Sequence, residues 1–354
     1  MLRPDAEIAF LTAGRSVGEH FFAGTDWPRH PLFPGEKAYP KRADVATWLG
    51  AFARARTVLS DFRPDVVAGF GSYPTALAAV ARLGPLPLAV PRFLVRSRRG
   101  PPLVLLEQNA IPGRSVRWLA PAAEKVLLAF EVAAVELPRV REAVVTGNPL
   151  PRAFTHGETP PFDVARYGLT AGRPTIVGLG GSQGARGVNE MILAARGELG
   201  TRWPDAQVLL LTGEGEHDAV RQAVDQSTGV PIALIPFSHE MKAIYAFADV
   251  IVARAGGTTL AELAIVGRPA ALVPYPYAAD DHQTANARVF EQAGAARIVA
   301  QGDAAPQRLL DAIAPWMDDA AARTTAGDAA RAMGRSDAAA RCAAELVAAA
   351  EAAR

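Results

Sequence analysis

The sequence contains a single cysteine, Cys342, among its 354 residues. One thiol excludes an internal disulfide and any metal site built from several cysteines, and it suits a reducing compartment. The sequence also lacks any run of eighteen consecutive apolar residues, and its first residues, MLRPDAEIAF, lack the basic-then-apolar order of a signal peptide. We therefore expect a cytosolic protein, or one that attaches to a membrane surface.

An excess of charge of one sign is also missing. The chain has 37 Lys and Arg residues against 36 Asp and Glu residues, a formal net charge of +1, which gives no indication of a nucleic-acid partner. Half of the residues are hydrophobic and 21% are charged, a composition typical of globular proteins. The length suffices for two domains that each have a hydrophobic core.

Short apolar runs alternate with amphipathic or alanine-rich stretches along most of the sequence. The predicted strands are Glu7–Thr12, Val66–Gly69, Leu103–Glu107, Val126–Ala129, Thr175–Leu179, Gln207–Thr212, Ile232–Pro236, Val250–Ala253 and Ala270–Val273. The predicted helices include Val45–Asp61, Pro74–Leu83, Val188–Leu199, Asp218–Asp225, Met241–Ala248, Thr259–Val266 and Gln283–Ala293, with further helices after Ala320. This alternation predicts an α/β protein of doubly wound parallel sheets, divided near the proline-rich segment Thr146–Pro161.

A glycine-rich stretch, GLGGSQGARGVNE, covers residues 178–190 and follows the β-branched run Thr175–Val177. Glycines after a strand allow a tight turn, and the free amides of the next helix attract anions, so a phosphate is the expected ligand. The alternative is a turn that only packs the helix on the sheet. The stretch is neither a P-loop nor a regular G-x-G-x-x-G.

A second glycine turn, RAGGTTLAEL, covers residues 254–263 and follows the predicted strand Val250–Ala253. Thr258 or Thr259 is a candidate helix cap, and Glu262 would then lie in the first turn. Glu262 is either part of a capping box or a carboxylate that accepts both hydroxyls of a ribose, and we favour the ribose role.

A third polar loop, PYPYAADDHQTANA, covers residues 274–287 and brings His282, Gln283 and Asn286 to the start of a helix. Ligands of parallel α/β sheets bind beyond the carboxyl ends of the strands, so we expect all three loops to face one crevice and to form a nucleotide site. A metal site at Asp280 and Asp281 is the less favoured alternative, since no D-x-D motif occurs.

The first half of the chain has its own polar turns. GFGSYP at 69–74 and LLEQNAIPG at 105–113 follow predicted strands and place Tyr73 and Asn109 at a cleft between the domains, unless these residues only form turns. The stretch Leu86–Gly100 mixes apolar residues with four arginines. It is either a solvated loop or a surface that contacts anionic lipid.

Together, GFGSYP, EQNAIPG, TGNP, GGSQGA, RAGGTTLAEL and AADDHQTANA resemble, in order and spacing, the MurG family of bacterial glycosyltransferases. The resemblance runs from about Glu7 to Val299. It implies a GT-B fold of two Rossmann-like domains, residues 1–152 for the acceptor and 153–334 for the donor, with a C-terminal helix over 335–354 that packs on the first. It also implies inverting transfer of N-acetylglucosamine (GlcNAc) from UDP-GlcNAc to the C4 hydroxyl of N-acetylmuramic acid in lipid I, which forms lipid II.

The resemblance assigns roles to individual positions. Tyr73 and Asn109 would line the reaction cleft, Glu262 would hold the uridine ribose, and Ser238 would lie at the uracil loop. The full set of implied donor-binding residues is Asn109, Arg152, Gly181, Ser182, Gln183, Ser238, Gly257, Thr258, Thr259, Glu262, His282 and Gln283. No cofactor and no metal are implied. The implied partners are UDP-GlcNAc, lipid I and an anionic membrane surface, at the cytoplasmic face of the membrane, and no nucleic acid is expected.

Two departures from the family pattern affect this interpretation. The family begins with GGTGGH, whose histidine is the favoured base, and this sequence contains no such string, so no catalytic residue is assigned; His20 follows the wrong strand. A misplaced start, a shortened chain or a genuine loss would each explain this. Moreover, Arg152 follows GNPLP, one residue later than in the family's GNPVR. The alternative functions are an impaired sugar-nucleotide-binding homologue, a GT-B transferase with another acceptor, and a UDP-GlcNAc epimerase.

Overall fold

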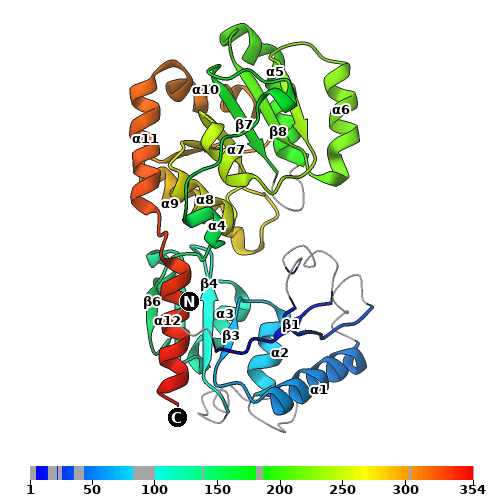
Figure 1. Cartoon of the computed structure of the whole chain (residues 1–354), viewed down its shortest axis with the longest axis vertical. Helices are drawn as coiled ribbons and strands as arrows, with labels where there is room; N and C mark the ends of the chain where they lie inside the picture. Colours follow the sequence, from blue (N-terminus) through cyan, green and yellow to red (C-terminus); the bar gives the residue numbers. More distant parts are fainter. Residues whose placement is uncertain are drawn as a thin grey trace. The chain divides into compact units, whose positions relative to one another are not determined.

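The computed structural model describes residues 5–14, 22, 26–35, 44–82, 100–137, 139–180, 186–302 and 305–353. These residues form two compact units (Figure 1). The first contains residues 1–108, 112–146 and 339–354, and the second contains residues 109–111 and 147–338. The main division follows Thr146, six residues before the predicted boundary at 152.

The first unit contains a four-stranded parallel sheet of order β3-β4-β5-β6 and a two-stranded parallel sheet, β1-β2. Its strands are β1 Phe10–Thr12, β2 Arg29–Pro31, β3 Val67–Gly69, β4 Leu103–Glu107, β5 Lys125–Leu128 and β6 Ala143–Val145. Its α-helices are α1 Val45–Phe62, α2 Tyr73–Ala81, α3 Arg114–Leu119 and α12 Ala338–Glu351, and α12 starts at the unit boundary. The 3₁₀ segments are η3 Ala120–Ala122 and η4 Glu131–Glu136.

Helix α12 packs on the sheet of the first unit through an apolar face. Cys342 and Ala349 are buried with Val104, Leu106 and Leu127 of β4 and β5. At the edge of this contact, Lys125 Nζ lies 2.5 Å from a carboxylate oxygen of Glu345 on α12. The last helix of the chain is thus part of the first core, although most of the residues before it belong to the second unit.

The second unit contains a six-stranded parallel sheet of order β12-β11-β10-β7-β8-β9. Its strands are β7 Thr175–Leu179, β8 Gln207–Leu211, β9 Ile232–Ile235, β10 Val250–Ala253, β11 Ala270–Leu272 and β12 Ala296–Ile298. Its α-helices are α4 Arg152–Thr155, α5 Arg186–Arg202, α6 His217–Asp225, α7 Met241–Phe247, α8 Gly257–Val266, α9 His282–Gln292, α10 Ala305–Asp318 and α11 Ala320–Met333. Short 3₁₀ segments are η5 Ala165–Tyr167, η6 Glu214–Glu216 and η7 Ala279–Asp281.

The central strands of this sheet are apolar because helices cover both faces. Every residue of β7, β8, β10 and β11 is buried. The chain enters at β7, builds outward through β8 and β9, and then returns to the other side of β7 with β10. The point between β7 and β10, where the direction of winding reverses, is where ligands of such sheets bind.

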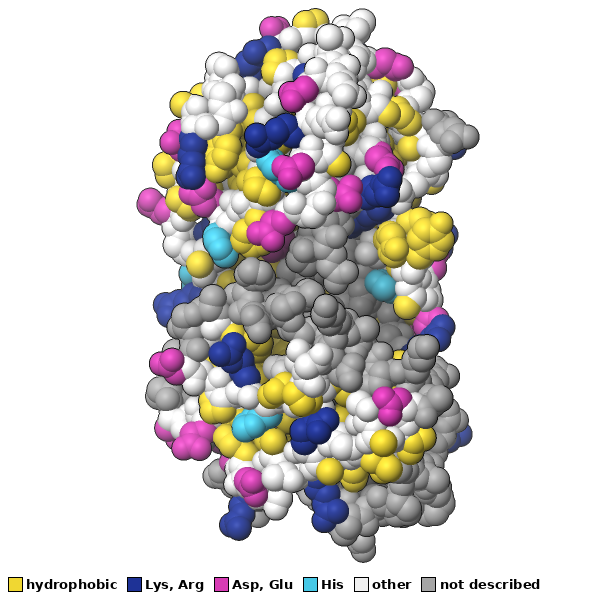
Figure 2. Space-filling model, turned by 90° about the vertical axis from the view of Figure 1, so that its right-hand side faces the viewer, with side chains coloured by type: hydrophobic (Ala, Val, Ile, Leu, Met, Phe, Trp, Pro, Cys, Tyr) yellow, Lys and Arg dark blue, Asp and Glu magenta, His cyan; other side chains and the backbone are white. Residues whose placement is uncertain are grey.

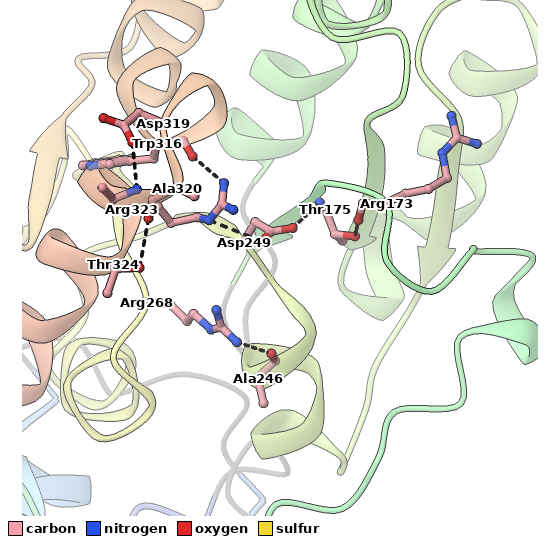
Figure 3. Close-up of polar contacts among 11 residues, drawn as sticks. Arg173, Thr175, Ala246, Asp249, Arg268, Trp316, Asp319, Ala320, Arg323 and Thr324 are labelled. Atoms are coloured by element: carbon pink, nitrogen blue, oxygen red, sulfur yellow. Dashed lines mark hydrogen bonds and ion pairs between the residues drawn. The ribbon is translucent and has the colours of Figure 1, made fainter.

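A polar cluster fixes the base of this sheet (Figure 3). The Asp249 carboxylate accepts a hydrogen bond of 2.8 Å from the amide of Thr175, and it lies 3.4 Å from Nε of Arg323 on α11. Arg323 also donates a 2.7 Å hydrogen bond to the carbonyl of Trp316 on α10. The cluster therefore joins β7 and the start of β10 to the two helices α10 and α11 within the second unit.

Two structural findings concern the surface. On the face shown in Figure 2, the described Lys and Arg side chains are interspersed with Asp and Glu side chains and form no extended area of one sign. Within the described parts of the chain, no helix has the length and apolar character needed to cross a membrane. The arginine-rich residues 86–99 lie outside the described residues.

The predicted strands and helices are largely confirmed. All nine predicted strands and all seven predicted helices are present with shifts of one to three residues at most of their ends. The sequence pattern did not indicate the short strands β2, β6 and β12 or helices such as α10. Each of these three strands contains an exposed residue, which in β12 is Arg297. All three strands lie at sheet edges, where no apolar run indicates a strand.

Candidate nucleotide site

The three polar loops of the second unit follow three neighbouring strands. Strand β10 pairs with β7 on one side and with β11 on the other, all parallel, so the carboxyl ends Leu179, Ala253 and Leu272 lie at the same edge of the sheet. The strand ends from which the three loops start therefore lie together, as expected. The edge coincides with the reversal between β7 and β10, the position at which ligands of doubly wound sheets bind.

The loop after β7 leads into α5. Gly181, Ser182 and Gln183 lie outside the described residues, and the description resumes with Arg186. At Gly187, in the first turn of α5, a Cβ atom would collide with the side chains of Gln301 and Arg254. Glycine therefore lets the backbone approach a cationic side chain closely at the point where the glycine-rich loop ends.

Arg254, which the sequence analysis did not select, follows β10 directly. Its Nη1 donates hydrogen bonds to the carbonyls of Val273 and Pro274, at 3.0 and 3.2 Å, and to Oε1 of Gln301 at 2.7 Å. The guanidinium also lies over the Tyr275 ring, 5.4 Å from its centroid. Burial lowers the pKa of this guanidinium from its usual value, but an arginine stays charged at neutral pH, so the carboxyl ends of these strands carry a fixed positive charge.

Helix α8 begins in the second glycine turn. The predicted cap at Thr258 or Thr259 is wrong: the N-cap is Gly256 in an extended conformation, no side chain caps the helix, and both threonines lie inside its first turn. A capping residue must have non-helical backbone angles, and the glycine takes this position one residue before Gly257. The first amides of α8 consequently have no side-chain acceptor of this kind and can donate to an anion.

Glu262 lies in the second turn of α8 instead of the first, so it is not part of a capping box. Its Oε2 accepts a 2.8 Å hydrogen bond from the hydroxyl of Tyr245 on α7, a partner that the sequence analysis missed. Burial raises the pKa of Glu262 to about 7, and the Tyr245 bond acts in the opposite direction. Near neutral pH, Glu262 is therefore a partly buried carboxyl whose charge responds to small changes around it.

The third loop turns into α9 through two residues with left-handed backbone. Asp280 and Asp281 both have φ of 53°, a conformation that costs energy in residues other than glycine. The Asp281 carboxylate accepts a 2.6 Å hydrogen bond from the hydroxyl of Thr284 and so stabilises the start of α9. Within the described ranges, no group of three or more His, Cys, Asp or Glu side chains has the arrangement of a metal site.

His282 and Gln283 have fixed side-chain orientations at the start of α9. Nδ1 of His282 lies 2.7 Å from the carbonyl oxygen of Ala279, so Nδ1 carries the proton and Nε2 is an acceptor in the neutral ring. Oε1 of Gln283 accepts a 2.9 Å hydrogen bond from the amide of Tyr275, which leaves its NH₂ group as a donor. The two side chains thus offer one acceptor and one donor.

Asn286 and Asn109 are joined by hydrogen bonds. Asn286 is fully buried; its Oδ1 accepts from the amide of Ala110 at 2.7 Å, and its Nδ2 donates to Oδ1 of Asn109 at 3.0 Å and to the carbonyl of Ala255 at 2.9 Å. Residues 109–111 are grouped with the second unit, and these bonds join Asn109 and Ala110 to Asn286 of α9. Sequence spacing gives no sign of a contact across 177 residues.

The remaining predicted residues lie on or next to other elements. Ser238 accepts a 3.0 Å hydrogen bond from the amide of Glu240 just before α7, and Arg152 is exposed at the start of α4. Tyr73 belongs to the first unit, where it is the first residue of α2; its ring lies 5.2 Å from that of Trp48 and is 46% exposed.

Known proteins share this sequence and fold. Residues 175–342 match the glycosyltransferase family 28 C-terminal domain. The UDP-N-acetylglucosamine--N-acetylmuramyl-(pentapeptide) pyrophosphoryl-undecaprenol N-acetylglucosamine transferase of Syntrophotalea carbinolica is 32% identical over 335 residues, which are 93% of this chain and 87% of that relative. The enzyme of the same name from Caldanaerobacter subterraneus is 32% identical over 293 residues, 81% of this chain and 75% of the relative.

Solved structures agree with these relatives. The crystal structure of Acinetobacter baumannii MurG superimposes with a TM-score of 0.71 and 25% identity, covering 98% of this chain and 92% of that one. A UDP-GlcNAc 2-epimerase from Neisseria meningitidis has a TM-score of 0.61 at 11% identity, a likeness that shows the fold alone. The chain therefore belongs to the MurG family of UDP-GlcNAc-dependent N-acetylglucosaminyltransferases, with the GT-B fold of that family.

Proposed function

We propose that this chain transfers GlcNAc from UDP-GlcNAc to the C4 hydroxyl of N-acetylmuramic acid in lipid I, with inversion at the sugar C1, and so forms lipid II for peptidoglycan. The names of its relatives describe this donor and this acceptor. The observation that carries the proposal is the placement of the uncapped start of α8 and the Glu262 carboxylate directly after β10, at the reversal of the sheet.

The diphosphate of the donor would lie against helix starts. The first amides of α8 and α5 carry partial positive charge, and Arg254 adds a full charge beside the first turn of α5. As the bond between the sugar C1 and the diphosphate breaks, negative charge grows on the departing UDP. Fixed donors already aimed at that position stabilise the transition state, so we propose that the reaction needs no metal ion.

The ribose and the sugar would contact side chains that are already oriented. A carboxylate accepts hydrogen bonds on both oxygens, so Glu262 can bind the vicinal 2′ and 3′ hydroxyls of the ribose. The donor NH₂ of Gln283 and the acceptor Nε2 of His282 suit the hydroxyls of GlcNAc, each of which can accept and donate. Gly181, Ser182, Gln183, Gly257, Thr258 and Thr259 are proposed to contact the diphosphate, and Ser238, Arg152 and Asn109 to complete the donor site.

The acceptor and the membrane would contact the first half of the chain. Tyr73 is proposed to contact the acceptor, and the arginines of residues 86–100 are proposed to contact anionic lipid at the cytoplasmic face. A basic segment gains about 1 kcal/mol per Lys or Arg near such a surface. The protein would then be peripheral to the membrane, as befits an acceptor that is a lipid.

A transfer assay tests this function. Purified protein is incubated with radiolabelled UDP-GlcNAc and lipid I, and the label is followed into the lipid fraction. The proposal predicts labelled lipid II and a loss of label transfer in Glu262→Ala, with the exposed Glu198→Gln on α5 as the matched control. Donor binding without transfer would indicate a binding homologue, and conversion of UDP-GlcNAc to its 2-epimer would indicate an epimerase; either result would contradict the proposal.

A further inference from the structure

Tyr245 is a buried tyrosine whose hydroxyl forms a hydrogen bond. It lies on α7 with 1% of its surface exposed, and it is the largest fully buried side chain among the described residues. Its ring packs edge-on against Phe154, with 5.9 Å between the centroids. Its hydroxyl donates to Oε2 of Glu262 on α8 at 2.8 Å. Helices α7 and α8 are neighbours in the second unit (Figure 1).

This hydrogen bond leaves the rest of the Glu262 carboxylate available. Two carboxylate oxygens offer about four acceptor positions, and Tyr245 occupies one of them on Oε2. The terminal torsion of a free glutamate is broad, so a carboxylate without such a donor would sample many orientations. One fixed donor therefore presents the remaining acceptors in a single orientation, which a vicinal diol requires because its two hydroxyls have a fixed spacing.

The same hydrogen bond affects the charge of Glu262. Burial raises the pKa of Glu262 to about 7, whereas the hydrogen bond from Tyr245 lowers it. Burial and the charge of Glu262 hold the pKa of Tyr245 well above its usual range, so the phenol keeps its proton and remains a donor. Thr259, one turn earlier on α8, also forms a hydrogen bond with Tyr245.

Several other ionisable groups on the helices packed against α8 have partners elsewhere. Lys242 of α7 donates to the carbonyls of His156 and Gly157, at 3.2 and 2.9 Å. Arg331 of α11 pairs with Asp328 on its own helix. On α9, His282 contacts the carbonyl of Ala279, and Glu291 accepts a hydrogen bond from the amide of Ile298. Among the described residues, two factors affect the pKa of Glu262: its burial and the hydrogen bond from Tyr245.

We propose that Tyr245 is a positioning residue for the ribose: through its hydrogen bond to Glu262, it selects a nucleoside diphosphate with both a 2′ and a 3′ hydroxyl over one that lacks the 2′ hydroxyl. This inference rests on the proposed function, in which Glu262 binds the ribose. Tyr245 itself does not touch the nucleotide. Its contribution is the orientation of the carboxylate and the ionisation of that carboxylate at neutral pH.

The test measures the affinities of the full-length protein for UDP and 2′-deoxy-UDP by calorimetry between pH 6 and 8.5. Tyr245→Phe removes only the hydroxyl and retains the ring that packs on Phe154. We expect it to weaken UDP binding about tenfold at pH 7, the effect of one hydrogen bond to a charged group. We expect a smaller loss for 2′-deoxy-UDP, which retains only the 3′ hydroxyl. We also expect the midpoint of the pH dependence to shift to higher pH, since the interaction that lowers the Glu262 pKa is lost.

The control is Tyr167→Phe, which removes a hydroxyl from a ring stacked on Phe162 in the same unit, at 5.3 Å. It should leave both affinities and the pH midpoint unchanged. Equal weakening of UDP and 2′-deoxy-UDP by Tyr245→Phe, with the midpoint in place, would overturn the positioning role and leave a structural one. A thermal unfolding curve shows whether the variant is folded.

Glu262→Ala separates this inference from the proposed function. If Glu262→Ala weakens UDP binding and Tyr245→Phe does not, the role of Tyr245 is wrong and the ribose site stands. If Glu262→Ala binds UDP as the unchanged protein does, both the ribose site and the role of Tyr245 are wrong.

Discussion

Replacing Glu262 by glutamine should stabilise this protein at alkaline pH. A carboxyl whose pKa is raised by folding binds its proton more tightly in the folded state, so its ionisation costs folding free energy. The pKa of Glu262 rises from 4.5 to about 7. This difference corresponds to about 3 kcal/mol of folding free energy, which is fully present below about pH 4.5 and is lost progressively as the pH rises from about 4.5 to above 7.

Glutamine keeps the shape of the side chain and an oxygen that accepts the hydrogen bond from Tyr245, but it never ionises. Glu262→Gln should therefore gain about 2.5 kcal/mol of unfolding free energy relative to the unchanged protein between pH 5 and pH 8.5, since a small part of the effect is already present at pH 5. Any cost of placing the amide NH₂ group is the same at both pH values and cancels in this comparison. The gain in stability should accompany a loss of donor affinity, since the neutral amide cannot accept hydrogen bonds on both of its terminal atoms.

The assay is urea unfolding at both pH values, followed by tryptophan fluorescence, because Trp203 and Trp316 lie in the same unit as Glu262. Glu198→Gln, at an exposed position on α5, is the control and should show no comparable change with pH. If the stability difference between Glu262→Gln and the unchanged protein were equal at pH 5 and pH 8.5, the buried carboxyl would not be ionising as we infer.

Three further predictions concern the nucleotide site and the membrane. Asn286→Ala should lower the unfolding free energy by about 2–4 kcal/mol in urea titrations, because it removes three hydrogen bonds from a fully buried position; a loss below about 0.5 kcal/mol would contradict this. Gln283→Ala should weaken binding of UDP-GlcNAc about five- to tenfold in calorimetry and leave UDP affinity unchanged, since its amide is proposed to contact the sugar; equal losses for both ligands would exclude that contact. Neutralising the four arginines between residues 91 and 99 should reduce binding to anionic vesicles at unchanged UDP-GlcNAc affinity, and vesicle binding equal to that of the unchanged protein would reject the segment as a lipid contact.

The sequence predicts most of this fold because the central strands are buried on both faces. Thr175–Leu179 and Val250–Ala253 are fully buried, mostly apolar runs that end in glycine turns. The sequence could therefore identify both runs as strands and locate their carboxyl ends. Strand β12 could not, because it contains only three residues with exposed Arg297 in the middle. Helix α10 was missed although its buried positions are apolar, since Pro315 lies inside it and prolines usually interrupt helices.

The site could be predicted only as far as it depends on local order along the chain. Glu262 follows a strand and a glycine turn, so its position at the sheet edge could be inferred. Its partner Tyr245 lies 17 residues away on another helix, and Asn109 meets Asn286 across 177 residues. Such pairs arise from the packing of helices and loops, which hydrophobic periodicity does not specify.

The central claim is that UDP-GlcNAc binds at the carboxyl ends of β7, β10 and β11. A crystal structure of the protein with UDP-GlcNAc tests it most directly. We predict the diphosphate at the starts of α5 and α8 and both ribose hydroxyls on the Glu262 carboxylate, with Tyr245 still bonded to Oε2. A nucleotide bound elsewhere, or a ribose that makes no contact with Glu262, would contradict the account.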